Sequence, residues 1–166
     1  MGEFSLRKLI RIKSKTGKSS TEWKKIKPLI IVLKNFLISK IGNMMPSNFN
    51  YLFFKLMGVK IENNVQLMPS PGFDFFFPEL ISVGEGTIIG MDCLILCHEF
   101  TTNEFKYGGV KIGRNVLIGA RSVVLAGVTI GDNSIIPANT LVYTNIPSNM
   151  IAFGSPLQFK KIENKR

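Results

Sequence analysis

Residues 112–147 read as six consecutive hexads: IGRNVL, IGARSV, VLAGVT, IGDNSI, IPANTL and VYTNIP. Each hexad begins with Ile or Val, and its fifth residue is small or β-branched. A period of six fits neither the 3.6-residue repeat of an amphipathic helix nor the two-residue alternation of a half-buried strand. The stretch therefore predicts a repeat architecture rather than an ordinary sheet or helical bundle.

The same phase continues upstream, with two interruptions. The earlier lead positions are occupied by large apolar residues: Ile61, Leu67, Phe73, Val83, Ile89 and Ile95. A six-residue unit suits one short strand followed by a tight turn, with the lead residue pointing inward and stacking on its equivalents in neighbouring coils. Three such units close a triangular coil of about 18 residues, which is the geometry of a parallel β-helix.

Four stretches carry a resemblance to a known family: GVKI (58–61), VKIGRNVLIG (110–119), GVTIGDNS (127–134) and IPSNMIAFGSP (146–156). They resemble the hexapeptide-repeat, or isoleucine-patch, acyltransferases, and within that family the sugar O-acetyltransferases, such as galactoside and maltose acetyltransferases and enzymes that modify surface polysaccharides. The resemblance implies an all-β main domain folded as a left-handed parallel β-helix, an exception to the right-handed crossover rule. It also implies acetyl-CoA as co-substrate and a homotrimer with sites between subunits.

The chain contains one histidine, His98, at the point where the regular hexads stop and residues 100–110 are expected to leave the coil as a loop. A neutral imidazole can take a proton from a hydroxyl group near pH 7. The resemblance places the family's catalytic base at His98. Its second ring nitrogen needs an acceptor, and the acidic candidates are Glu99, Asp92 and Asp74, of which Asp74 stands near the position where relatives bind the acceptor. The sequence does not choose among the three.

By the same resemblance, the pantetheine arm of CoA runs along the later coils in a groove between subunits. The matching positions are Ala120, Ala126, Ala138 and Thr144, with Lys161 towards the nucleotide. Small residues let the backbone approach a ligand, but the corners of a β-helix favour small residues whether or not CoA binds.

Two cysteines, Cys93 and Cys97, lie close to His98 in the sequence. They would give a metal only three soft ligands, and neighbouring side chains 97 and 98 on a strand face opposite ways, so we expect packed thiols and no metal site. Two cysteines with no secretory signal ahead of them also predict a reducing compartment, and hence a cytoplasmic protein.

Basic residues are concentrated at the N-terminus. Residues 1–60 hold 13 Lys or Arg against two Glu, whereas residues 61–166 hold 8 Lys or Arg against 9 Asp or Glu. Apolar residues at helical spacing between 22 and 57 predict one or two helices. We therefore expect a basic N-terminal helical segment (1–57), the β-helix (58–162) and a short basic tail (163–166).

The expected helices have two possible roles. They could cover the first coil, as the terminal repeat of a β-helix requires, or lie on an anionic membrane surface, as basic amphipathic helices do. An aromatic patch follows, at Phe73 and residues 75–77, and it could serve as a subunit interface, an acceptor platform or a lipid contact. Nucleic-acid binding is not expected, because the basic segment shows no recognised motif.

Together these features predict an acetyl-CoA-dependent O-acetyltransferase that acts on a sugar or a surface-glycan intermediate. N-acetylation of an amino sugar is the close alternative. An alternative of a different class is a non-catalytic β-helix scaffold or a peripheral membrane-binding module, in which the hexads serve stability alone.

Overall fold

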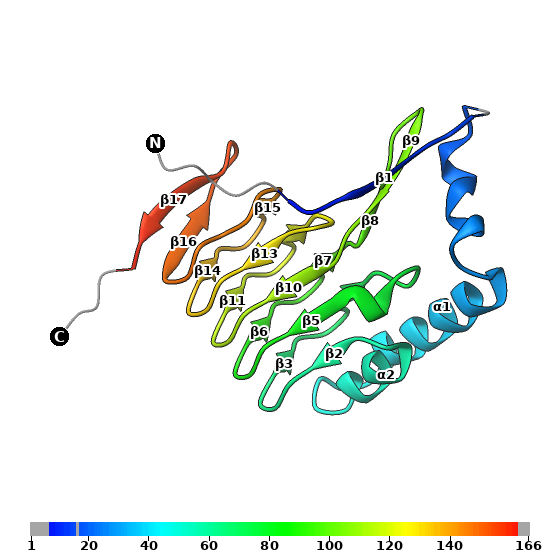
Figure 1. Ribbon diagram of the computed structural model, residues 1–166. Coiled ribbons are helices and arrows are strands. Elements are labelled where there is room, and N and C mark those ends of the chain that lie inside the picture. The colour runs from blue at the N-terminus through cyan, green and yellow to red at the C-terminus, as the bar shows by residue number, and fades with distance from the viewer. Residues whose placement is uncertain (1–6, 16, 163–166) are drawn as a thin grey trace.

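The main body of the protein is a three-sided parallel β-helix (Figure 1). The computed structural model describes residues 7–15 and 17–162, so the basic tail expected at 163–166 lies outside the described residues. Side 1 consists of β2 (Lys60–Ile61), β5 (Ile81–Val83), β10 (Val110–Ile112) and β13 (Thr129–Ile130). Side 2 consists of β3 (Gln66–Leu67), β6 (Ile88–Ile89), β11 (Leu117–Ile118), β14 (Ile135–Ile136) and β16 (Met150–Phe153). Side 3 consists of β4 (Gly72–Phe73), β7 (Leu94–Ile95), β12 (Val123–Val124) and β15 (Leu141–Val142).

The lead residues of the hexads form the core, as the repeat predicts. On each side they stand in register, one coil above another, in three inner ladders: Ile61, Val83, Ile112 and Ile130; Leu67, Ile89, Ile118 and Ile136; Phe73, Ile95, Val124 and Val142. All twelve are buried. Stacking like residues removes their apolar surface from water along the whole coil, so the repeat itself is the hydrophobic core.

The corners between the sides are tight. Residues in the left-handed region occupy equivalent corner positions, among them Asn115, Asn133 and Asn139 with φ of 51°, 57° and 58°. Gly119 approaches the next coil so closely that an added Cβ would lie 2.3 Å from the backbone nitrogen of Ala138. These corners explain why Asn and Gly follow the lead residues of the hexads.

The two interruptions of the repeat both leave the coil at the edge where side 3 meets side 1. The first follows β4 and ends in a short 3-10 helix, η2 (Pro78–Leu80). The second follows β7 and forms a hairpin of β8 (His98–Phe100) and β9 (Glu104–Tyr107), where the sequence predicted a plain loop. We call this corner the site edge.

The N-terminal segment contains a strand that the expected helical segment did not include. β1 (Ile10–Lys13) pairs antiparallel with β9 and completes a three-stranded sheet beside the coil (Figure 1). The pairing partner is more than 90 residues away in the chain, so local sequence patterning carried no signal for it. At the other end, β17 (Gln158–Lys161) pairs antiparallel with β16 after the last coil.

The N-terminal helices cover the first coil. They are α1 (Leu29–Met44) and α2 (Asn50–Met57), whereas η1 (Ser19–Lys25) packs on β9 of the hairpin. α2 buries Phe54 against Phe73, with ring centroids 4.9 Å apart, and Asn50 donates a hydrogen bond to the carbonyl of Leu67 at 3.3 Å. α1 packs on α2 and lies on the outside of the molecule (Figure 1). Within residues 7–15 and 17–162, no helix has the length and apolar character needed to cross a membrane.

Candidate active site

The β-helix brings Asp74 and His98 to the same edge in successive coils. Asp74 directly follows β4, and His98 is the first residue of β8, three residues after β7 ends. β4 and β7 are neighbours on side 3, with Phe73 in register with Ile95. Two residues 24 positions apart in the sequence are therefore stacked at the site edge.

The imidazole of His98 is held by the carboxylate of Asp74. The distance from His98 Nδ1 to Asp74 Oδ2 is 2.6 Å. The carboxylate is fully buried and also accepts the backbone N–H groups of Cys97 at 2.7 Å, Phe76 at 2.8 Å and Phe77 at 3.2 Å. A carboxylate that receives these N–H groups acts as a hydrogen-bond acceptor, so the imidazole must donate to it. We therefore assign the ring proton to Nδ1, which leaves Nε2 with a free lone pair. That is the protonation state a general base requires.

Aromatic rings surround the imidazole. The ring of His98 has its centroid 4.6 Å from that of Phe76 and 5.1 Å from that of Phe100, with Phe77 and Phe105 slightly further out at 6.3 Å and 6.2 Å. The aromatic patch expected from the sequence is thus divided: Phe73 lies in the core, whereas Phe76 packs against the base. The rings restrict the motion of the imidazole and exclude water from part of its surface.

A cavity of about 190 Å³ opens beside the dyad between α1 and side 3. Its lining residues come from both, and they are Phe36, Ser39, Lys40 and Asn43 of α1 together with Gly72, Phe73, Asp74, Phe75, Leu94, Leu96 and His98. The wall is largely apolar, but Asn43 Oδ1 is buried and finds no hydrogen-bond partner among the described residues. The cavity can hold a small acceptor within reach of His98, with Asn43 as a hydrogen-bond acceptor for it.

The other two acidic candidates are engaged elsewhere. Glu99 forms an ion pair with Arg7, which also donates a hydrogen bond to the carbonyl of Ala126 at 3.1 Å. Asp92 is a corner residue with φ of 55°, and its carboxylate lies 4.0 Å from Nε of Arg121. Among Asp74, Asp92 and Glu99, the carboxylate in contact with the imidazole is that of Asp74.

The positions expected to contact CoA lie on two different edges. Ala126 and Thr144 stand on the site edge in the two coils that follow His98, and Ala126 is buried. Ala120 and Ala138 stand in successive coils on the edge between sides 2 and 3. Lys161 is exposed on β17.

Sequence reasoning did not single out Arg7 or the lining residues of α1. Arg7 reaches Glu99 and Ala126 because β1 docks on β9, and Phe36 and Asn43 reach the cavity because α1 packs across side 3. Both contacts are tertiary and leave no periodic or motif signal in the local sequence.

Both thiols are packed, as expected. Cys93 Sγ donates to the carbonyl of Gly119 at 3.1 Å, and both cysteine side chains are fully buried. Burial raises the pKa of each thiol, and the negative charge of Asp74 raises that of Cys97 further. Among the residues that the structure describes, there is no group of three His, Cys, Asp or Glu side chains that could hold a metal ion.

Comparison with known sequences identifies relatives over most of the chain. The family model "Bacterial transferase hexapeptide (six repeats)" matches residues 109–144. YvoF of Bacillus subtilis (strain 168), named as a candidate acetyltransferase, is 39% identical over 135 residues, which are 79% of this chain and 77% of that protein. The galactoside O-acetyltransferase of Escherichia coli (strain K12) is 34% identical over 93 residues, 52% of this chain and 46% of that protein.

Solved structures share the fold. A galactoside acetyltransferase in complex with coenzyme A superposes with a TM-score of 0.64 at 22% identity, covering 82% of each chain. A maltose O-acetyltransferase from Clostridium difficile 630 superposes with a TM-score of 0.58 at 21% identity, covering 82% of this chain and 88% of that one.

Proposed function

Because the chain belongs to the hexapeptide-repeat acetyltransferases, we propose that it transfers the acetyl group of acetyl-CoA to a hydroxyl group of a sugar or a surface-glycan intermediate. The observation that carries this proposal is the Asp74–His98 pair at the wall of a largely apolar cavity that opens between α1 and side 3. The relatives that the chain matches are named as acetyltransferases, and one of them as a galactoside O-acetyltransferase.

His98 is the general base in this proposal. Its Nε2 removes the proton of the acceptor hydroxyl while the oxygen attacks the thioester carbonyl of acetyl-CoA. The C–O bond forms, a tetrahedral oxyanion results, and a backbone N–H group stabilises it. The C–S bond then breaks, and the departing CoA thiolate takes the proton back from His98. Asp74 is a positioning residue, because it holds the imidazole in the tautomer with a free Nε2.

Acetyl-CoA would lie along the site edge beyond His98, past Ala126 and Thr144. We propose a homotrimer, in which the edge of a neighbouring copy supplies Ala120 and Ala138 to the same CoA and Lys161 reaches its nucleotide end. The outward residues of the coil support such an assembly. On sides 2 and 3 they include the exposed Leu94, Leu117 and Leu141, whereas on side 1 they are Lys60, Ser82, Lys111 and Thr129.

Two further features of the proposal come from the family. The coil is proposed to wind in the left-handed sense that hexapeptide repeats adopt, and the protein to act in the cytoplasm, where acetyl-CoA is available. The buried Cys93 and Cys97 fit a reducing compartment, since neither is part of a disulfide.

The test is thiol release from acetyl-CoA by the purified protein over a panel of sugars and amino sugars. We expect release that depends on an acceptor and falls by a factor of about 100 or more in His98→Ala, the scale of general-base catalysis. Lys111→Ala, an exposed change on side 1, is the control and retains wild-type rates. Faster turnover of amino sugars than of their hydroxyl counterparts would move the assignment to N-acetylation. Unchanged turnover in His98→Ala would overturn the proposed base.

A further inference from the structure

The outer face of α1 is apolar and exposed. Ile30 is 72% exposed, Leu37 is 60% exposed and Met44 is 81% exposed, and Leu33 and Ile41 between them are also exposed. Steps of three and four residues place these side chains on one stripe of the helix. The buried residues Val32, Asn35, Ser39 and Gly42 recur at the same steps and point the opposite way, to the coil and α2.

Exposed apolar side chains also occur on α2, which packs on α1, and in the turn before it. Phe49, Leu52 and Leu56 are each at least half exposed. This much exposed apolar surface on one pair of helices is unusual on a protein that meets only water, and it generally marks a binding face.

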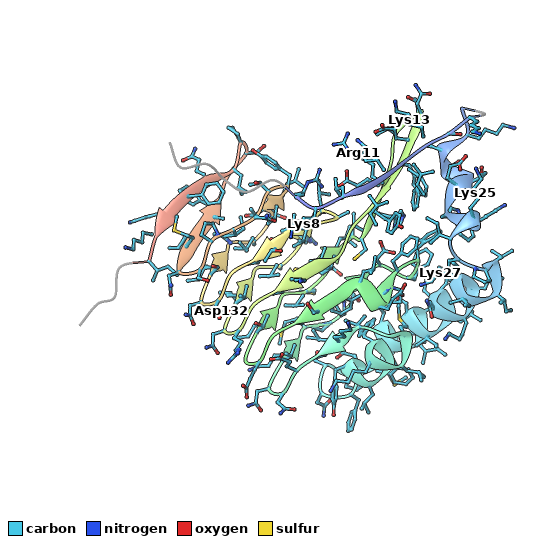
Figure 2. All side chains as sticks on the ribbon, in the orientation of Figure 1. Lys8, Arg11, Lys13, Lys25, Lys27 and Asp132 are labelled. Carbon is cyan, nitrogen blue, oxygen red and sulfur yellow. The ribbon has the colours of Figure 1, made fainter. Side chains whose placement is uncertain are left out.

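Lysines border the stripe. Lys34 and Lys40 are exposed and fall on its two sides by helical spacing, and Lys55 is exposed on α2. The sequences of α1 and α2 contain no Asp or Glu. Of the two lysines before α1, Lys25 ends η1 and pairs with Glu22, and Lys27 pairs with Glu79, so the border consists of the lysines of α1 and α2 (Figure 2). An apolar stripe bordered by lysines matches a bilayer surface, because the stripe enters the acyl region while the long lysine side chains reach the anionic head groups.

The same helix forms a wall of the acceptor cavity. Phe36 and Lys40 are exposed on α1 and also line the cavity that contains His98, with Lys40 Nζ 5.4 Å from the centroid of the Phe36 ring. The mouth of the cavity therefore adjoins the apolar stripe. An acceptor that approached from the surface on which α1 rests would enter beside Lys40.

We propose that α1 holds the enzyme on an anionic bilayer and that the acceptor is carried by that bilayer, as a hydroxylated sugar-type head group on a lipid anchor. The second part rests on the proposed acetyl transfer by His98. A bilayer fits this face better than a second copy of the chain does. A contact of α1 with α1 would bring the lysines of both copies together, whereas an anionic bilayer neutralises them and buries the stripe.

The binding test is co-sedimentation of the full chain with vesicles of phosphatidylglycerol and phosphatidylcholine, and with vesicles of phosphatidylcholine alone. We expect binding to the anionic vesicles that weakens in high salt. We also expect a drop of at least about tenfold in Ile30→Glu/Leu37→Glu, which places two negative charges in the exposed stripe that the bilayer would cover. Lys34→Gln should bind roughly fivefold more weakly, the effect of one basic residue near an anionic surface. The matched control is Lys60→Gln/Lys111→Gln, which lowers the net charge by the same amount as Ile30→Glu/Leu37→Glu but changes residues on side 1. This control should bind the vesicles nearly as well as the wild type does.

Each other outcome overturns the membrane contact. Equal binding by the stripe variant would show that the stripe does not contact the bilayer, and an equal loss in the side 1 variant would show that net charge alone acts. If the stripe variant instead dissociates into smaller species in sedimentation velocity, a second copy covers α1. Circular dichroism of each variant shows whether the helices remain folded, and Ile30→Gln/Leu37→Gln is the milder pair if the charged one does not fold.

The acceptor test compares thiol release with lipid glycosides in the anionic vesicles and with the corresponding free methyl glycosides. We expect faster release with the lipid glycosides, and a loss of at least about tenfold in the stripe variant for those alone. Equal rates on both forms, with no effect of the stripe variant, would overturn the lipid-borne acceptor. Absence of thiol release from every acceptor, with vesicle binding intact, would instead count against the proposed transferase and leave the membrane contact standing.

Discussion

Asp74→Asn tests the positioning of the base with the smallest change in shape. Oδ1 of Asp74 accepts the backbone N–H groups of Phe76 and Phe77, so an asparagine must keep its carbonyl oxygen there. Its amide nitrogen then replaces Oδ2 and faces two donors, Nδ1 of His98 and the N–H of Cys97. The imidazole can restore its hydrogen bond only by moving its proton to Nε2, and an Nε2 that carries a proton cannot act as the base.

The expected loss in kcat is large. A base held in the wrong tautomer should lower kcat by a factor of about 100 to 10,000, which corresponds to roughly 3–5 kcal/mol of activation free energy. The unpaired N–H of Cys97 should also lower the free energy of unfolding by about 1–3 kcal/mol. The KM for acetyl-CoA should stay within about threefold of wild type, because a positioning residue does not touch the thioester.

The assay is steady-state thiol release, with kcat and KM measured separately and circular dichroism used to confirm the fold. Adding Asp74→Asn to His98→Ala should cause little further loss, because two residues that act through one imidazole are not additive. A kcat within about threefold of wild type in Asp74→Asn, or a fully additive loss in the double variant, would refute the positioning role.

Other features of the fold lead to three further predictions. Cys93 and Cys97 should resist thiol reagents in the native protein and react on unfolding. Because burial raises the pKa of both thiols, the free energy of unfolding should fall as pH rises through about 8.5, where the thiols of the unfolded chain ionise and those of the folded protein do not. Urea titrations at successive pH values should show a smaller fall for Cys97→Ala. Ile118→Ala should lower the free energy of unfolding by about 2–5 kcal/mol and Ile118→Val by about 1 kcal/mol, since the side chain is fully buried in an inner ladder; equal losses in denaturant titration would contradict the ladder. Gly119→Ala should cost about 1–3 kcal/mol, because its Cβ would lie 2.3 Å from the backbone nitrogen of Ala138, and an unchanged melting temperature would show that the corner can open.

The repeat specified the coil because its information is local and periodic. A lead residue such as Ile112 or Ile130 needs no distant partner to identify it, since its equivalents recur in phase and each coil stacks on the one before. The confirmed ladders and the position of His98 at a break in the repeat both follow from that periodicity. Because the same hexads resemble those of the hexapeptide-repeat acyltransferases, they also led to the prediction of acetyl transfer.

The sequence determined the β-helix and the family, and it reduced the partner of His98 to three acids. The tertiary structure decided among them: the carboxylate of Asp74, one coil before His98, contacts the imidazole, whereas that of Glu99, on β8, pairs with Arg7. It also showed that β1 is a strand paired with β9, that α1 walls the cavity, and that the outer stripe of α1 remains uncovered. These contacts join segments far apart in the chain, so they depend on how complete surfaces pack together and not on any pattern within one segment.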